Sequence, residues 1–277
     1  MNSFTLNNGI TMPALGFGTF KMNGEECAQS VAEAIRCGYR MIDTAEAYKN
    51  EEAVGTGIAE GGVPRGELFI VTKVNFRSYP KTHETVEASL KKLRTDYLDL
   101  VLLHWPLGDY YAAWRELEKL YAEGVVRAIG VSNFNPDRLI DLIEFNEVTP
   151  AANQIEMHLL CQRRAEREWM DKYGVRCMAY APLGQGRRNE MFENAELTAV
   201  AAAHGKSPAQ TALRFLMQSG AAVVPKSSHA ERIAENAALF DFELSAEEMA
   251  RLEKMDTGIA MSGTPESPVK VEALLKQ

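Results

Sequence analysis

Four side chains that could together transfer a proton follow three apolar, strand-like segments of the chain. Asp43 and Tyr48 follow the first segment, Lys73 lies in the second, and His104 ends the third. A tyrosine hydroxyl has an ordinary pKa of about 10, which a neighbouring ammonium group would lower by stabilising the phenolate. We therefore expect Lys73 to lower the pKa of Tyr48, and Asp43 to hold Lys73 in place. His104 would donate a hydrogen bond to a carbonyl oxygen, and the group as a whole would stabilise an oxyanion formed as a carbonyl is reduced.

Each of these residues taken alone is more often structural than catalytic. A tyrosine after a strand commonly packs against its neighbours, and an Asp–Lys pair is commonly a structural ion pair. Their joint position at successive strand ends favours a shared site. No metal centre is predicted, because this group has a single histidine and no second histidine or paired carboxylate at ligand spacing.

The segments that position these residues belong to a regular alternation of short apolar strands and longer helical stretches. Strands are expected near residues 14–18, 39–43, 68–74, 98–104, 126–131, 152–156, 175–180 and 222–224. Helices are expected near residues 25–37, 51–60, 82–92, 112–123, 136–144, 163–173, 208–219 and 231–239. Ser207-Pro208-Ala209-Gln210 and Asn135-Pro136 have the composition of capped helix starts. Eight strand–helix units predict an α/β fold, a (β/α)8 TIM barrel, in which residues after the strands share one mouth.

The main alternative is a doubly wound dinucleotide-binding fold. Such a fold should carry G-x-G-x-x-G after a strand. Gly16-Phe17-Gly18 and Gly184-Gln185-Gly186 both lack the third glycine. We therefore expect one barrel domain over residues 1–277, with an N-terminal β-hairpin at 1–12, an extra C-terminal helix opening at Ser245, and a tail or loop at 257–277.

Composition narrows the possible partners and location. The net charge of −8, from 30 basic and 38 acidic residues, argues against nucleic-acid binding. No apolar run is long enough for a transmembrane helix, and the N-terminus lacks the pattern of a signal peptide. The four cysteines show no ligand-like spacing. We expect a cytoplasmic protein with free thiols and no membrane partner.

The chain resembles the aldo-keto reductase family. The segment from Asp43 to Gly55 is similar to the pattern D-T-A-x-x-Y-x-N-E-x-x-V-G, and further similar segments are Gly130-Val131-Ser132-Asn133-Phe134, Asn153-Gln154, Pro225-Lys226-Ser227 and Glu235-Asn236. The resemblance implies an NADPH-dependent carbonyl reductase with Tyr48 as general acid and with Asp43, Lys73 and His104 at the other catalytic positions.

The resemblance also implies a set of cofactor contacts. Ser132, Asn133 and Gln154 would hold the nicotinamide carboxamide, although local sequence alone is equally consistent with turn and cap chemistry. Tyr180 would stack on the nicotinamide ring. Further contacts are expected from Gly18, Thr19 and Asp43, from Leu183 and Gln185 near the pyrophosphate, and from Glu235 and Asn236 at the adenine. Arg187 and Arg188 could form an electrostatic clasp over the cofactor.

A basic helix start provides separate evidence for a phosphate site. Ser228 and Glu231 are spaced as a capping box, and a helix N-terminus after a barrel strand favours anions. Lys226 and Arg232, with Ser227 and Ser228 between them, could bind the 2′-phosphate of NADPH. A solvated basic helix start is the alternative. His229 leaves NADH use open.

The substrate is the least determined part of the prediction. Phe20 and Trp105, with Tyr48 and His104, would wall an apolar pocket, joined by Phe76 and Tyr79. The short tail predicts an open site for small aldehydes, ketones or sugar-derived carbonyls. Two other functions stay open: an alcohol dehydrogenase acting mainly in the oxidative direction, and a non-catalytic cofactor-binding subunit. We expect a monomer.

Overall fold

The computed structural model describes residues 3–261 and 267–276, and its centre is an eight-stranded parallel sheet. The strands are β3 (Gly16–Gly18), β4 (Met41–Asp43), β5 (Phe69–Val74), β6 (Leu100–Leu103), β7 (Ile129–Ser132), β8 (Ala152–Glu156), β9 (Arg176–Tyr180) and β10 (Ala222–Val223). Neighbours in the sheet follow chain order from β3 to β10. A parallel bridge between Leu15 and Val223, with a 2.9 Å bond from Val223 N to Ala14 O, brings the two edges together. The predicted barrel is confirmed.

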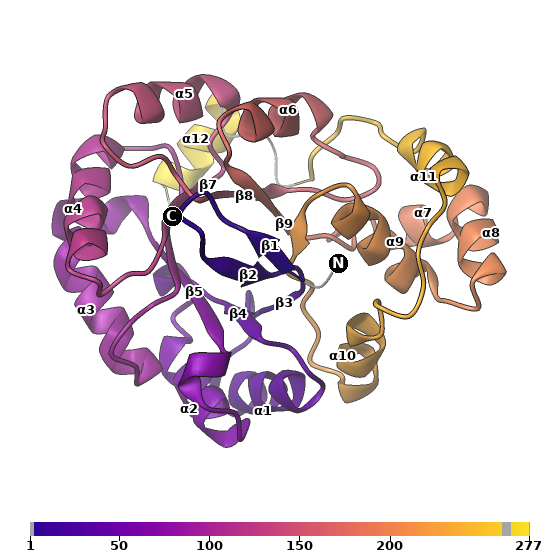
Figure 1. The fold of residues 1–277 in the computed structure, drawn as a ribbon, viewed down its shortest axis with the longest axis horizontal. Helices are drawn as coiled ribbons and strands as arrows, with labels where there is room; N and C mark the ends of the chain where they lie inside the picture. Colours follow the sequence, from indigo (N-terminus) through magenta and orange to yellow (C-terminus); the bar gives the residue numbers. More distant parts are fainter. Residues whose placement is uncertain (1–2, 262–266, 277) are drawn as a thin grey trace.

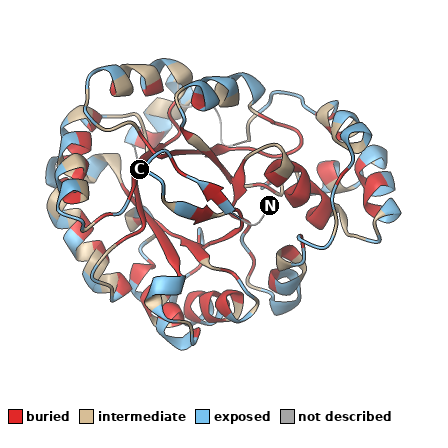
Figure 2. Cartoon of the chain, viewed as in Figure 1, coloured by how far each residue is buried: buried red, intermediate tan, exposed pale blue. Residues whose placement is uncertain are grey.

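The strands are apolar because both of their faces are buried. All four residues of β6 are fully shielded from solvent, and all six of β5 are buried. Figure 2 shows the strands buried at the centre and the solvent-facing sides of the helices exposed. Continuous apolar runs of this kind are typical of parallel sheets covered by helices.

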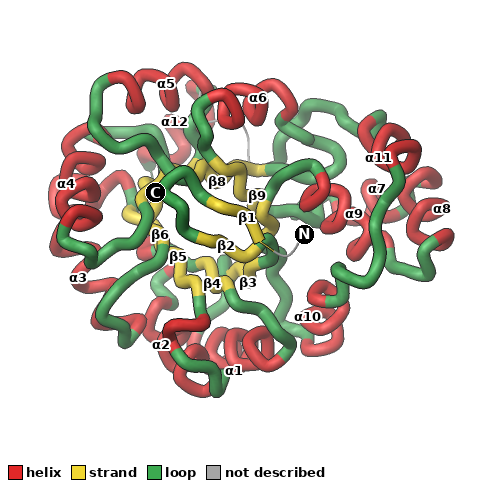
Figure 3. Tube along the Cα trace, in the orientation of Figure 1, coloured by secondary structure: helices red, strands yellow, loops and turns green. Residues whose placement is uncertain are grey.

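Eight helices surround the sheet, one after each strand or its loop (Figures 1 and 3). They are α1 (Gly24–Arg36), α2 (Glu51–Glu60), α3 (Thr82–Leu93), α4 (Tyr110–Ala122), α5 (Pro136–Glu144), α6 (Arg164–Lys172), α9 (Pro208–Gln218) and α10 (Ala230–Ala237). Each agrees with its predicted range to within two residues. Most of them are amphipathic and bury one side against the barrel, which is why their positions could be predicted from apolar spacing. The exception is α9, in which every residue from Ala209 to Met217 is buried.

Helix caps explain several of these boundaries. Ser207 and Gln210 form the expected capping box at the start of α9, with bonds of 3.2 and 3.0 Å. Ser245 forms a second box, and the extra helix α11 (Ala246–Glu253) follows it. Asn135 precedes α5 with Pro136 in the first turn, but it makes no side-chain capping bond to that helix.

The capping box predicted at Ser228 and Glu231 is wrong. The N-cap of α10 is His229, which makes no side-chain capping bond. Ser227 accounts for the difference, because its hydroxyl oxygen accepts the backbone N–H of His229 at 3.1 Å. This local turn shifts the helix start, so Ser228 is left outside the cap position.

The N-terminal hairpin lies across one end of the barrel. Strands β1 (Ser3–Thr5) and β2 (Thr11–Pro13) pair antiparallel, with Phe4 opposite Met12 and both side chains buried. Figure 1 shows the pair in front of the ring of strands. Since β2 leads directly into β3, the hairpin covers the amino-terminal ends of the strands and leaves their carboxyl ends free. The predicted hairpin is confirmed.

Several elements were not predicted. They are the short 3-10 helices η1 (Glu46–Tyr48), η2 (Arg65–Glu67) and η3 (Phe76–Lys81), and the helices α7 (Arg188–Phe192), α8 (Ala195–Ala203) and α12 (Pro268–Leu275). The tail at 257–277 was expected to be irregular, so α12 corrects that expectation, while residues 262–266 and 277 of the tail lie outside the described part. Within the described residues, no helix is both long and apolar enough to cross a membrane.

The helix α12 packs at the carboxyl ends of β5 and β6. The Arg77 guanidinium donates a 2.6 Å hydrogen bond to the carbonyl oxygen of Leu275. The Lys270 Nζ atom lies 5.4 Å from the centroid of the Trp105 ring. Arg77 and Trp105 follow β5 and β6, so the tail adds a helix to the rim of the barrel mouth.

Candidate active site

A buried ion pair forms the base of the candidate site. The Lys73 Nζ atom lies 2.9 and 2.8 Å from the two carboxylate oxygens of Asp43, and 2.8 Å from the Thr44 carbonyl oxygen. Asp43 ends β4 and Lys73 lies in the neighbouring strand β5, so the sheet itself sets their separation. All three acceptors lie within hydrogen-bonding distance of the ammonium group, which satisfies the donors of a buried charge.

Tyr48 lies above this pair at the end of η1. Its ring centroid is 5.2 Å from Lys73 Nζ, 4.9 Å from the Phe20 ring and 5.9 Å from the His104 ring. Lys49 ends η1 with a left-handed φ of 55°, which turns the chain away after Tyr48. The half-buried ring is thus held between two rings, with the buried ammonium close by.

The net pKa of Tyr48 is shifted upward, and the lowering effect expected of Lys73 stays a prediction. Burial, together with the carboxylate of Asp43, raises the pKa of Tyr48 well above its usual value. Lys73 forms an ion pair with Asp43. Burial lowers the pKa of Lys73, whereas the negative charge of Asp43 raises it. Tyr48 is therefore a neutral hydroxyl at neutral pH, which is the form that can give up a proton.

His104 is a neutral imidazole beside Tyr48. Burial and the positive charge of Lys73 lower its pKa from 6.5 to about 3. Its Nδ1 atom is buried and has no hydrogen-bond partner among the described residues. A neutral imidazole carries one N–H, which can be donated to a carbonyl oxygen.

The three residues expected at the nicotinamide form a hydrogen-bonded row along the ends of β7 and β8. Ser132 Oγ donates to the Gln154 carbonyl oxygen at 2.8 Å, and Gln154 Nε2 donates to Asp43 Oδ1 at 2.7 Å. Asn133 Nδ2 lies 3.0 Å from the His104 carbonyl oxygen, and Asn133 Oδ1 accepts the Tyr180 hydroxyl at 2.9 Å. The structure therefore joins Ser132, Asn133, Gln154 and Tyr180 to the Asp43–Lys73 pair.

Gly18 and Thr19 lie at the end of β3 beside the same pair. A Cβ atom on Gly18 would be 2.9 Å from the Val224 carbonyl oxygen, so only glycine allows this close approach of the backbones. Thr19 is buried, and its hydroxyl donates to the Asp43 carbonyl oxygen at 3.1 Å. Both residues thus support the backbone that carries Asp43.

The basic segment after β10 is separate from this network and faces solvent. Lys226 and Arg232 are exposed, and neither forms an ion pair within the described residues. Ser227 is buried, Ser228 and Glu235 are half-buried, and Asn236 on α10 is buried. Two unpaired cations near the start of α10 are available to an anionic ligand.

The loop after β9 holds Leu183, half-buried, and Gln185, exposed. Arg187 is paired with Glu190, and the Arg188 guanidinium lies 4.8 Å from the Phe192 ring. Both arginines make these contacts within the segment 187–192, and their clasp over a cofactor stays a prediction.

Sequence reasoning missed the residues that support the loop carrying Tyr48. The Asn50 side chain is buried, accepts the Thr44 hydroxyl at 2.8 Å, and donates to the carbonyl oxygens of Thr19 and Met22 at 2.8 and 2.9 Å. Glu51 accepts the Thr72 hydroxyl at 2.7 Å. Both residues lie inside the motif from Asp43 to Gly55, so the signal was present but their supporting role was not inferred.

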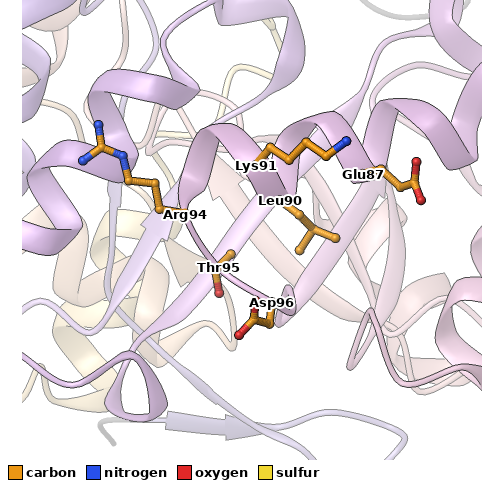
Figure 4. A pocket seen from close by; sticks show the side chains of 6 residues that line it. All are labelled: Glu87, Leu90, Lys91, Arg94, Thr95 and Asp96. Carbon is orange, nitrogen blue, oxygen red and sulfur yellow. The ribbon is translucent and has the colours of Figure 1, made fainter.

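A surface hollow occurs at the other end of the barrel. Figure 4 shows the side chains that line it, which come from the end of α3 and the turn after it: Glu87, Leu90, Lys91, Arg94, Thr95 and Asp96. This turn leads into the amino-terminal end of β6. The hollow is therefore distinct from the network at the carboxyl ends of the strands.

Comparisons with known proteins agree with this arrangement. The profile of the Aldo/keto reductase family matches residues 14–257. A glyoxal reductase of Bacillus subtilis is 45% identical over 265 residues, covering 94% of this chain and 95% of the relative. The methylglyoxal reductase DkgA of Salmonella typhimurium is 40% identical over 264 residues, covering 94% and 96%. The crystal structure of a Bombyx mori aldo-keto reductase in complex with NADP is 34% identical with a TM-score of 0.87, covering 94% of this chain and 95% of the other.

Proposed function

Because this chain belongs to the aldo/keto reductase family and is therefore an oxidoreductase, we propose that it reduces small aldehydes and ketones to alcohols with NADPH. One observation supports the proposal most directly. The ring of Tyr48, which carries a neutral hydroxyl, lies between the rings of Phe20 and His104 and close to the buried Lys73–Asp43 pair. That arrangement places a proton donor and a hydrogen-bond donor at one mouth.

In the proposed reaction, Tyr48 gives its proton to the carbonyl oxygen. NADPH, when bound, supplies the hydride that reaches the carbonyl carbon. The neutral His104 imidazole would donate a hydrogen bond to the same oxygen. The phenolate left on Tyr48 would be stabilised by the ammonium group of Lys73, 5.2 Å from the ring centroid, and Asp43 would keep Lys73 charged despite its burial.

The residues present fit a nicotinamide dinucleotide phosphate. Ser132, Asn133 and Gln154 bring hydroxyl and amide groups to the Asp43 side of the mouth, where a carboxamide would bind, and Tyr180 brings an aromatic ring. The remaining contacts are proposed at Gly18, Thr19, Leu183, Gln185, Ser227, Ser228, Glu235 and Asn236.

The choice of NADPH over NADH is proposed from the exposed, unpaired cations Lys226 and Arg232, which suit a 2′-phosphate. The crystal structure of the Bombyx mori aldo-keto reductase in complex with NADP supports this choice. His229 is exposed between them, so some use of NADH is included in the proposal.

The substrate class is proposed from the pocket walls and from the relatives. Phe20 and Trp105 lie on either side of Tyr48 and His104, which gives a small apolar site. The relatives named for glyoxal and methylglyoxal support small carbonyl compounds. A single barrel domain over residues 1–277, a monomeric state and a cytoplasmic location stay predictions.

The variant Tyr48→Phe tests this function. It removes one hydroxyl and keeps the ring that packs against Phe20. We expect methylglyoxal-dependent oxidation of NADPH to fall about 100-fold or more, which is the usual contribution of a general acid, while NADPH binding measured by fluorescence titration is retained. Unchanged turnover would contradict the role of Tyr48.

The same assay separates the rival functions. A wild-type protein that binds NADPH but turns over none of a panel of aldehydes, ketones and alcohols would be a cofactor-binding subunit. Faster turnover of alcohols with NADP⁺ than of the matching carbonyls with NADPH would indicate a dehydrogenase.

A further inference from the structure

Three aromatic side chains at the barrel mouth each have a cation over the ring. The pairs are Lys21 with Phe20 at 5.4 Å, Arg77 with Phe76 at 5.2 Å, and Lys270 with Trp105 at 5.4 Å, measured to the ring centroids. In the part of the chain that the structure describes, none of the three cations forms an ion pair with an acidic side chain. We call these six residues the cationic rim.

Lys270 is connected to His104 through Trp105, the member of the cationic rim that stacks beside that histidine. The Trp105 ring stacks beside the His104 ring at 5.9 Å and 23°, and His104 lies 5.9 Å from Tyr48. The half-buried Lys270 contacts the same Trp105 ring from α12. Tyr48, His104, Trp105 and Lys270 thus follow one another in a row of contacts, so a substrate whose carbonyl oxygen lies at Tyr48 and His104 and whose body extends along Trp105 would bring its far end towards the ammonium group.

Two carboxylates lie near the cationic rim. Asp43 is paired with Lys73, so its charge is balanced inside the mouth. Glu46 accepts hydrogen bonds from the Ser78 hydroxyl at 2.6 Å and from the Asn75 N–H at 3.0 Å, which are neutral donors, so Glu46 keeps its negative charge. In a chain with a net charge of −8, the mouth therefore carries three cations that form no ion pair among the described residues, beside this one uncompensated carboxylate.

Arg77 also fixes the position of Lys270. Its guanidinium donates to the Leu275 carbonyl oxygen at 2.6 Å, near the end of α12, while Lys270 lies in the first turn of the same helix. The two contacts hold both ends of α12 against the mouth, so the lysine side chain is directed over Trp105.

From this arrangement we infer that the protein favours carbonyl substrates that carry a carboxylate or phosphate at the end away from the reacting carbonyl, with Lys270 as a specificity-determining residue. The inference rests on the proposed function and adds the charge of the substrate to it. A lysine over an aromatic ring keeps an apolar surface for the body of the substrate and a positive charge for its end.

Matched substrates test the inference. The first pair is 4-carboxybenzaldehyde, an anion at neutral pH, and its neutral methyl ester, methyl 4-formylbenzoate. The second pair, glyceraldehyde 3-phosphate and glyceraldehyde, extends the test to phosphate. We expect the wild-type kcat/KM to be higher for the anion than for the neutral compound in at least one pair. In Lys270→Met, this ratio of kcat/KM values should fall about threefold to fivefold, because the lost charge interaction is partly screened by solvent. Lys270→Arg should retain most of the preference.

Two internal controls keep the result interpretable. Lys276→Met removes an exposed charge from the same helix, where Lys276 is paired with Glu272 at 2.8 Å, and should leave the preference unchanged. Turnover of the neutral substrates and the KM for NADPH should be the same in Lys270→Met and wild type.

The outcomes separate the two proposals. No turnover of any of the four carbonyls by the wild type would overturn the proposed function. Turnover without an anion preference, or an equal loss for charged and neutral substrates in Lys270→Met, would overturn the charge inference and leave the reductase proposal standing.

Discussion

The ammonium group of Lys73 lies 2.9 and 2.8 Å from the two carboxylate oxygens of Asp43, and both side chains are buried. Neighbouring strands place the two residues, so the pair is as rigid as the barrel itself. Asp43 also accepts the Gln154 amide at 2.7 Å. One carboxylate thus links the proposed proton-transfer group to the proposed nicotinamide site.

Asp43→Asn should destabilise the protein strongly. The substitution leaves the Lys73 ammonium buried without its counter-ion, which typically costs about 3–5 kcal/mol. The measurement is the free energy of unfolding from urea denaturation at pH 7. Asp137→Asn is the matched control, because both side chains of the Arg138–Asp137 pair are exposed and its loss should change stability little. Similar losses in the two variants would show that burial of the Lys73–Asp43 pair has no special role.

His104 should make the protein less stable as the solution becomes acidic. Its pKa is lowered from 6.5 to about 3 in the folded state, so between these values the unfolded chain binds a proton that the folded chain does not. The contribution of His104 to the free energy of unfolding is fully present above pH 6.5 and decreases as the pH falls towards 3. We expect His104→Gln to lose less stability than the wild type between pH 7 and pH 4.5, measured by urea unfolding.

His83 provides the control for that experiment. It lies on α3 and is partly exposed, 3.8 Å from Glu87. His83→Gln should show the wild-type dependence on pH. If His104→Gln also shows the wild-type dependence, His104 is not the buried neutral imidazole described above.

Lys226→Ala should weaken NADPH binding more than NADH binding. Lys226 is exposed and unpaired among the described residues, so its proposed partner is the 2′-phosphate that NADH lacks. We expect the Kd for NADPH to rise about tenfold, or ~1.4 kcal/mol, and the Kd for NADH to stay nearly constant. Fluorescence titration measures both constants. The exposed Lys254, which directly follows α11, offers Lys254→Ala as the control. Equal weakening of both cofactors by Lys226→Ala would refute the assignment.

Most of the barrel could be predicted from the sequence because its signals are local. Leu100–Leu103 forms a strand buried on both faces, and the apolar run alone shows this. Ser207 and Gln210 cap α9 through atoms within four residues of each other, so the helix start could be placed exactly. The capping box expected at Ser228 failed because a competing bond to Ser227, equally local, defines the turn.

The charge states in the site could not be predicted in the same way. Lys73 is predicted to lower the pKa of Tyr48, but burial and the carboxylate of Asp43 raise this pKa, and the net shift is upward. The closeness of Tyr48 and Lys73 could be inferred from the sequence. The sign of the net shift in the Tyr48 pKa depends on how much water reaches its hydroxyl and on which acceptors surround the Lys73 ammonium group. Both quantities depend on distances between side chains from different strands.

The sequence by itself determined the alternation of strands and helices and the residue types at the strand ends, including Asp43, Tyr48, Lys73 and His104. Apolar periodicity is a property of neighbouring residues in the chain. In a parallel barrel the carboxyl ends of all strands lie at one end, so residues that follow the strands share one mouth. Only the tertiary structure decided that Tyr48 is neutral, that His104 is uncharged, and that Lys270 lies over Trp105. Desolvation and long-range contacts decide these properties, because Trp105 and Lys270 are 165 positions apart in the sequence and meet only after α12 packs against the barrel.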